Sequence, residues 1–214
     1  MTLPKDRPLA YLITTGHATD RDFVRTSSDV IASVTIAVKN GVSMVQLREK
    51  QLSGANLYRL AGELSEIIRD SGCQFFINDR ADVAIAVGAH GVHLTSSSLP
   101  VKVVRAAFGT KLSIGLSTHS VQDISGAIES GADFAVIGPV FATPGKDLLI
   151  GLDGLRSASN AFKDFPVIAL GGVNEANFRE TIDAGAAGFA AIRSLNDLES
   201  MKRIMLSVRP DLKV

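Results

Sequence analysis

Short apolar runs alternate along this chain with longer segments in which apolar residues recur every three or four positions. The runs stop at glycine or at polar residues, which is typical of strands buried on both faces of a parallel sheet. Eight such runs cover residues 11–14, 44–50, 75–77, 91–94, 112–117, 134–140, 166–170 and 188–192. The helical spacing between and after them predicts helices over 29–40, 54–71, 81–87, 100–108, 121–130, 154–162, within 174–187 and over 197–208.

Four glycines share one position relative to these elements. Each ends a helical segment and is followed at once by the next apolar run, as in a glycine helix stop. They are Gly41, Gly88, Gly131 and Gly185. This alternation predicts an α/β fold, a (β/α)8 TIM barrel formed by a single domain over residues 1–214. A doubly wound open sheet is the alternative, but no G-x-G-x-x-G fingerprint follows the first strand.

The composition suits one domain around one core, because 46% of the 214 residues are hydrophobic. Lys plus Arg (22) balances Asp plus Glu (22), so no overall charge favours nucleic acid or an anionic membrane. No stretch approaches the roughly 20 apolar residues of a membrane span, and residues 1–8 are too polar and short for a signal peptide. We therefore expect a cytoplasmic protein. The lone Cys73 is expected to be buried at a strand start.

The last two strand segments end in backbone that suits an anion. Gly171 and Gly172 follow the first of them, and Arg193 and Ser194 follow the second. Glycines leave N–H groups bare at the carboxyl end of a strand, just before a helix N-terminus, where a phosphate can bind. In many TIM barrels the loops after strands seven and eight form such a phosphate site.

Polar side chains end several other strand segments. The carboxyl ends of all barrel strands lie on one rim, so these residues are expected to converge there. The expected ligand-binding set is Gln46, Arg48, Lys50, Asn78, His93, Ser117, Thr143, Lys146, Gly171, Gly172, Arg193 and Ser194. Its cations suit a ligand with phosphates, because arginine grips oxygens bidentately and lysine adds a point charge. A solvated surface position is the alternative for each of the two lysines.

Two histidines, His93 and His119, lie in or directly after strand-like runs. Histidine is the side chain most easily tuned for proton transfer near neutral pH, so both are candidates for acid–base chemistry. A structural histidine is the alternative for each. No His, Cys and Glu spacing matches a zinc site, and Asp79 is the rim residue that suits a hard metal ion.

Six motifs resemble those of the thiamine phosphate synthase and TenI-like thiazole tautomerase superfamily. They are VQLREK at 45–50, INDR at 77–80, GVHL at 91–94, GLSTH at 115–119, GPVFAT at 138–143 with Lys146, and ALGGV at 169–173. The resemblance covers nearly the whole chain, from Tyr11 to Leu195. By resemblance, a homodimer is also expected.

In the synthase branch, the resemblance implies a pyrimidine diphosphate with Gln46 near the pyrimidine. The implied diphosphate contacts are Arg48, Lys50, Asn78, Ser117 and Lys146. Mg²⁺ held by two aspartates then draws off pyrophosphate while a thiazole phosphate nitrogen attacks. Asp79 matches the first aspartate, but Ser98 stands at the position of the second, and a hydroxyl is a poor substitute for a carboxylate. Arg193 replaces a serine near the thiazole phosphate.

The tautomerase branch also lacks the second aspartate and needs no metal. The resemblance implies a proton shift within a thiazole carboxylate phosphate, carried out by the histidine that matches His119. Ser98 and His119 lead us to rank the tautomerase first. The synthase is the alternative, because the diphosphate set is retained, and a non-catalytic barrel that binds a phosphorylated ligand is the third hypothesis.

Overall fold

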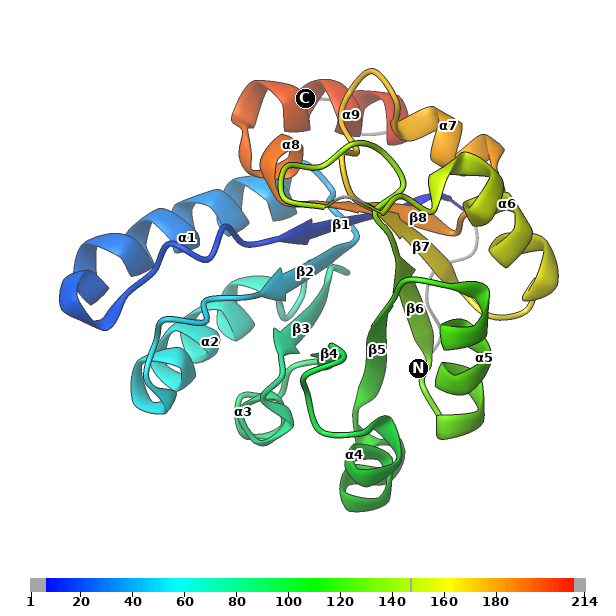
Figure 1. Cartoon of the computed structure of the whole chain (residues 1–214). Coiled ribbons are helices and arrows are strands. Elements are labelled where there is room, and N and C mark those ends of the chain that lie inside the picture. Colours follow the sequence, from blue (N-terminus) through cyan, green and yellow to red (C-terminus); the bar gives the residue numbers. More distant parts are fainter. Residues whose placement is uncertain (1–6, 147, 210–214) are drawn as a thin grey trace.

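Eight parallel strands close into a barrel in the computed structural model, which describes residues 7–146 and 148–209 (Figure 1). The strands are β1 (Leu9–Ile13), β2 (Met44–Leu47), β3 (Gln74–Asn78), β4 (Gly91–Leu94), β5 (Ser113–Thr118), β6 (Phe134–Ile137), β7 (Val167–Leu170) and β8 (Gly188–Ala191). Each strand pairs with the next in chain order, and β8 returns to β1 with Gly188 opposite Leu9. The predicted TIM barrel is confirmed. The predicted domain also includes residues 1–6, 147 and 210–214, which lie outside the described residues.

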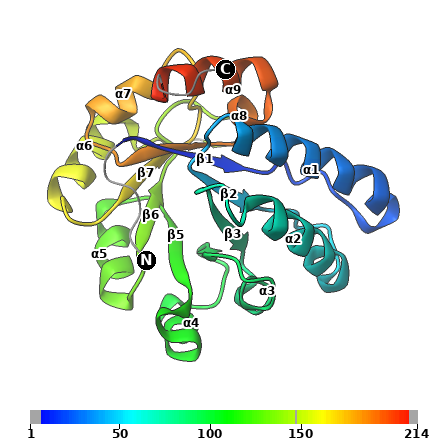
Figure 2. The ribbon, with the colours of Figure 1, turned by 180° about the vertical axis from the view of Figure 1, so that it is seen from behind.

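Helices surround the barrel on its outer side (Figures 1 and 2). They are α1 (Phe23–Lys39), α2 (Gly54–Ile68), α3 (Ala81–Ala86), α4 (Val101–Phe108), α5 (Val121–Ser130), α6 (Gly151–Ala161), α7 (Phe178–Asp183), α8 (Arg193–Asn196) and α9 (Leu198–Val208). Ser53 caps α2 by accepting a hydrogen bond from the Asn56 N–H, as serine commonly does at helix N-termini. All four predicted glycine stops have positive φ angles, so each helix ends in the left-handed conformation before its next strand.

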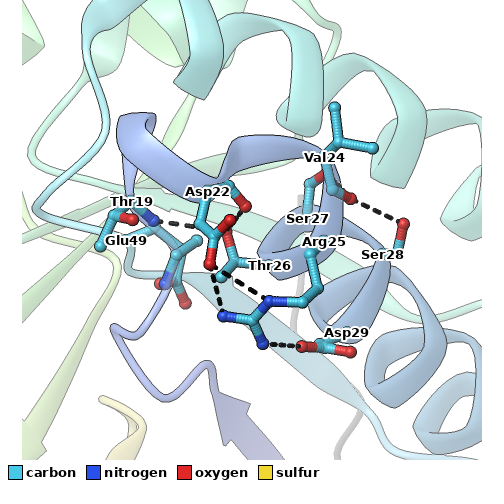
Figure 3. A network of polar contacts seen from close by, with 10 residues as sticks. Thr19, Asp22, Val24, Arg25, Thr26, Ser27, Ser28, Asp29 and Glu49 are labelled. Carbon is cyan, nitrogen blue, oxygen red and sulfur yellow. Dashed lines mark hydrogen bonds and ion pairs between the residues drawn. The ribbon is translucent and has the colours of Figure 1, made fainter.

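Helix α1 begins at Phe23, whereas the sequence pattern predicts a polar loop up to Ser28 and a helix from Asp29. The buried face of its first turns includes Thr26 and Ser27, and these hydroxyls donate to the backbone carbonyls of Asp22 and Val24. Arg25 bonds Asp22 and lies 3.7 Å from Asp29 on the exposed side (Figure 3). Small hydroxyl residues can be buried here because the helix backbone satisfies them, so apolar periodicity underestimates the helix.

The short helix α8 is absent from the sequence prediction, which places a loop at Arg193 and Ser194. Asn196 at its end donates to the Ile13 carbonyl at 2.8 Å and accepts from the Ser33 hydroxyl at 3.1 Å. These bonds join the end of the chain to β1 and α1, and Figure 1 shows α8 beside α1. Helix α9 also contacts α1, so the last helix packs against the first and closes the outer ring.

Three aromatic rings fill the middle of the barrel. Tyr11, Phe76 and Phe134 are fully buried, and each pair meets edge to face, with ring centroids 5.2 to 6.1 Å apart. Neighbouring strands make room for them with Gly91 and Gly115. A β-carbon at Gly115 would lie 2.3 Å from the Phe134 ring, so this strand position admits glycine alone without repacking.

Replacing Gly115 with alanine is expected to lower the free energy of unfolding by about 1–3 kcal/mol, the usual cost of overpacking a core. Urea denaturation followed by circular dichroism measures this loss. The matched control is Gly126→Ala in the middle of α5, where a β-carbon would meet nothing within 4 Å. Because alanine favours helix, the control should be neutral or stabilising. Equal losses in both variants would contradict the proposed crowding against Phe134.

Cys73 lies at the start of β3 and is 4% exposed, as its position in the sequence predicts. Burial raises the pKa of its thiol to about 12, so the thiol stays protonated at neutral pH.

None of the helices in the described part of the chain has both the length and the apolar character that a membrane span requires.

Candidate functional site

The carboxyl ends of the strands bring polar residues from distant parts of the chain to one rim, as the barrel topology requires. Three of them, Gln46, His93 and Ser117, connect through Tyr11 in the barrel interior. The Gln46 amide nitrogen lies 3.1 Å from the Tyr11 hydroxyl, which lies 3.4 Å from His93 Nδ1. His93 Nε2 is 2.9 Å from the Ser117 hydroxyl. The polar chain Gln46–Tyr11–His93–Ser117 therefore spans strands β2, β1, β4 and β5.

His93 is 2% exposed at the centre of this polar chain. Burial lowers its pKa from 6.5 to about 4, the charge of Asp79 opposes this shift, and the charge of Arg48 adds to it. The imidazole is therefore neutral at pH 7. This environment fits a fixed hydrogen-bonding role rather than that of a proton donor near neutral pH.

The buried histidine should make the protein's stability depend on pH. In the unfolded chain His93 binds a proton near pH 6.5, but in the folded chain only near pH 4. The contribution of neutral His93 to the free energy of unfolding is therefore fully present above pH 6.5 and is lost as the pH falls toward 4. The loss is about 2 kcal/mol at pH 5. Urea denaturation at several pH values checks this. His93→Gln should reduce the change in the free energy of unfolding between pH 6.5 and 5, whereas His17→Gln, at an exposed position, should not. Equal pH dependence in His93→Gln and the wild type would contradict this prediction.

Asp79 forms a second cluster at the ends of β3 and β4. It has a positive φ of 63°, a conformation that aspartate tolerates better than most residues, and its N–H donates to the His93 carbonyl. One carboxylate oxygen accepts from the Asn78 amide at 2.7 Å and the other from the Ser98 hydroxyl. The Thr95 N–H and hydroxyl in turn contact Ser98. The sequence-predicted metal residue and its substituted partner are thus in direct contact.

Asn78 carries a buried acceptor without a partner. Its Oδ1 makes no hydrogen bond within the described protein, and the residue is 7% exposed. An unsatisfied buried acceptor costs about 1–3 kcal/mol. A ligand N–H group or a cation at the rim would satisfy it.

Arg48 and Glu49 follow β2 and have different roles. The Arg48 N–H donates to the Thr14 hydroxyl at 2.9 Å instead of to a strand carbonyl. Strand β2 therefore ends at Leu47, three residues before the end that the sequence predicts. The half-buried Arg48 guanidinium makes no hydrogen bond or ion pair with any described residue. The buried Glu49 carboxylate instead accepts from the N–H groups of Gly16 and Ala18, at 3.0 and 2.7 Å. Arg48 is therefore available to a ligand, while Glu49 fixes the loop after β1.

His119 follows β5 and is exposed at the rim. Its Nδ1 lies 2.6 Å from the Gly138 carbonyl, so Nδ1 carries the proton and donates. With Nδ1 bonded to Gly138, Nε2 is the ring nitrogen left for a ligand at the rim. The His119 N–H donates to Asp123 at 2.8 Å, which fixes the backbone beneath the ring.

The loops after β6 and β7 pack tightly against each other. Gly171 and Gly172 have φ angles of 98° and 65°, and a β-carbon on either would lie within 2.7 Å of the β6 loop. Within the described chain the N–H groups of Gly172 and Val173 have no hydrogen-bond partner. The Ser194 hydroxyl donates to the Val173 carbonyl at 2.9 Å, so this side chain joins the two predicted phosphate loops. Among the described residues, the N–H groups of Gly172 and Val173 are thus available to an anion here.

The remaining predicted ligand residues lie in the loops after β2 and β6 and at the start of α8. Lys50, Lys146 and Arg193 are exposed, and the Thr143 hydroxyl donates to the Phe141 carbonyl at 3.0 Å within its own loop. The loop from Lys146 to Gly151 includes residue 147, which lies outside the described residues. These residues are less constrained than the clusters around His93 and Asp79.

Comparison with known proteins identifies the family. The family model described as thiamine monophosphate synthase matches residues 10–195. The chain belongs to the thiamine monophosphate synthase family. The resemblance found in its motifs is therefore confirmed.

Relatives of this family member cover nearly all of its length. The thiamine-phosphate synthase of Caldanaerobacter subterraneus subsp. tengcongensis is 41% identical over 193 residues, which are 88% of this chain and 89% of the relative. A putative thiamine-phosphate synthase of Geobacter sulfurreducens is 38% identical over 94% of this chain and 93% of its own. The solved thiamine phosphate pyrophosphorylase of Pyrococcus furiosus superposes with a TM-score of 0.83 at 30% identity, over 98% of this chain and 99% of that one. These names support the synthase alternative better than the tautomerase ranked first from the sequence.

Magnesium, which the synthase branch implies, fits this member of the family only together with a diphosphate. Among the described residues no group of three or more His, Cys, Asp or Glu side chains could hold a metal. Asp79 and the unpartnered Asn78 oxygen are suitable hard donors, but Ser98 adds no charge. Since Mg²⁺ is often bound by one carboxylate plus substrate phosphates, the donor set suffices when the ligand supplies the other oxygens.

Sequence reasoning missed two residues of the site. Tyr11 is part of the first apolar run, and a hydroxyl on a buried barrel strand was the available signal. Glu49 lies inside one of the family motifs, and a carboxylate beside a buried strand end was the signal there. In both cases the partner atoms are backbone or side-chain groups 31 to 82 residues away.

Proposed function

We propose that this chain is a thiamine-phosphate synthase, which joins a hydroxymethylpyrimidine diphosphate to a thiazole phosphate and releases pyrophosphate. The observation that carries the proposal is the rim itself, where the Arg48 guanidinium, which has no partner among the described residues, lies within electrostatic reach of His93. A dianionic or trianionic leaving group needs such a set of cations and donors. The names of the full-length relatives support the same reaction.

In this reaction one C–O bond breaks and one C–N bond forms, so the protein must mainly position two ligands and stabilise the leaving charge. Arg48 and Ser117 would hold the diphosphate, together with the amide hydrogen of Asn78 that is not bonded to Asp79. Gln46 would contact the pyrimidine. The N–H groups of Gly172 and Val173 would hold the thiazole phosphate. Asp79 and the diphosphate would hold Mg²⁺, which when bound supplies charge neutralisation to the leaving group.

The second candidate is the thiazole tautomerase. The observation that favours it is the orientation of His119, whose Nδ1 bond to Gly138 leaves Nε2 as an acceptor at the rim. One imidazole nitrogen could remove a proton and return it to a neighbouring atom. The absence of a second carboxylate at Ser98 has no cost for that reaction, because it needs no metal.

One assay separates the candidates. Purified protein is incubated with pyrimidine diphosphate, thiazole phosphate and Mg²⁺, and in parallel with thiazole carboxylate phosphate alone. The synthase proposal expects thiamine phosphate and pyrophosphate in equal amounts from the first mixture. Isomerisation in the second mixture without product in the first would overturn it in favour of the tautomerase. If neither reaction occurs but phosphorylated thiazole binds in calorimetry, the chain is a non-catalytic binding barrel.

A further inference from the structure

The polar chain Gln46–Tyr11–His93–Ser117 has only two self-consistent arrangements of its protons. Tyr11 and His93 are buried, and their partners among the described residues are the members of this chain. The 3.4 Å between the Tyr11 oxygen and His93 Nδ1 is long for a hydrogen bond, but within the described protein neither group has another complementary partner. A buried hydroxyl proton without an acceptor would cost more than a long bond.

The first arrangement begins with the Gln46 amide nitrogen, which can only donate. Tyr11 accepts that bond, so its own proton must point to His93 Nδ1. A neutral imidazole that accepts at Nδ1 carries its proton on Nε2, and it donates from there to the Ser117 oxygen. The Ser117 proton is then available to a ligand at the rim, while the Gln46 carbonyl oxygen presents an acceptor.

The second arrangement follows if the Gln46 amide is rotated by half a turn. Its carbonyl oxygen would then accept from Tyr11, His93 would donate from Nδ1, and Ser117 would give its proton to His93 Nε2. Ser117 would present only lone pairs to the rim, and Gln46 would present an NH₂ group. The two ends of the polar chain are therefore coupled: one is a donor when the other is an acceptor.

We propose that Tyr11 is a positioning residue that holds the polar chain in the first arrangement, with Gln46 as acceptor and Ser117 as donor toward the ligand. This inference rests on the proposed function and deepens it. Diphosphate oxygens only accept, so they match a Ser117 donor, and Arg48 lies within electrostatic reach of His93, to which Ser117 is bonded. The polar chain then presents an acceptor at Gln46 and a donor at Ser117 to a ligand at the rim.

The tautomer of His93 tests the arrangement directly in the ligand-free protein. Long-range proton–nitrogen NMR at pH 7 should show His93 protonated at Nε2 and unprotonated at Nδ1. In Tyr11→Phe, which keeps the ring and removes the hydroxyl, the two tautomers should mix. The matched control is Tyr58→Phe, because the other tyrosine of this chain is exposed on α2. A wild-type proton on Nδ1, or an unchanged tautomer in Tyr11→Phe, would overturn the proposal.

Binding of inorganic pyrophosphate, measured by calorimetry, tests the coupling to Ser117. Tyr11→Phe and Ser117→Ala should each weaken binding about fivefold, the effect of one hydrogen bond of about 1 kcal/mol. The double variant should bind no more weakly than Ser117→Ala, because Tyr11 acts through Ser117. Additive losses would overturn the positioning role. If wild-type protein does not bind pyrophosphate, the proposed function fails, and the tautomer measurement still decides the arrangement of the polar chain.

Discussion

Replacing Asp79 with asparagine is expected to reduce kcat/KM for thiamine phosphate formation by about two to three orders of magnitude. Asp79 is the carboxylate that lies against Asn78 and Ser98, where the diphosphate and Mg²⁺ are proposed to bind. Asparagine has nearly the same shape and also tolerates the φ of 63° at this position, so the change removes the charge and keeps the backbone. Steady-state kinetics over a range of Mg²⁺ concentrations measure the loss.

The same Mg²⁺ titration separates a metal-site role from a structural one. Ser98→Asp restores a second carboxylate and should lower the Mg²⁺ concentration for half-maximal activity about tenfold. Ser97→Asp is the matched control, because it adds the same charge one residue away on an exposed side chain. The affinity for Mn²⁺, measured by electron paramagnetic resonance, should likewise rise in Ser98→Asp and stay nearly unchanged in Ser97→Asp. Asp79→Asn activity within threefold of the wild type would contradict this prediction.

Arg48→Ala should cause a loss of similar size, about 10²–10³ in kcat/KM, because a bidentate bond to a charged oxygen pair contributes roughly 3–4 kcal/mol. The guanidinium makes no hydrogen bond with the described residues, so its removal should leave the folded chain otherwise intact. Kinetics with varied pyrimidine diphosphate give the loss, and urea denaturation shows that stability is retained.

Two further variants define the cause of that loss. Arg48→Lys keeps the charge without the planar fork and should recover only part of the activity. Arg69→Ala is the control, since Arg69 is exposed beyond α2 and pairs with Glu66. An Arg48→Ala enzyme with normal KM and kcat would exclude Arg48 from the diphosphate site.

The contacts of Ser98 explain why the synthase is favoured over the tautomerase that the sequence ranks first. In the sequence alone, Ser98 and His119 are separate signals that favour a metal-free proton shift. The structure places Ser98 on the Asp79 carboxylate, beside the unpartnered oxygen of Asn78, so one carboxylate remains oriented at the rim. A missing second aspartate is thus compatible with diphosphate chemistry, and the named relatives favour that chemistry.

The sequence by itself determined the barrel, and with it which strand ends lie at the rim. Strand runs, glycine stops such as Gly131 and the Ser53 cap are local signals, because each depends on neighbours within a few positions. Parallel strands then require that residues such as Asn78 and Ser117 meet at one end. That part of the prediction needs no knowledge of side-chain contacts.

Only the tertiary structure decided which of these residues touch. Tyr11 stands between Gln46 and His93, and Ser98 meets Asp79, because of strand register and loop paths that no local pattern encodes. The early start of α1 at Phe23 has the same origin, since buried hydroxyls look polar in sequence and become satisfied only in the folded helix. Hydrogen bonds between residues far apart in the chain depend on positions fixed by the whole barrel, and so the proton arrangement at the site is a property of the fold.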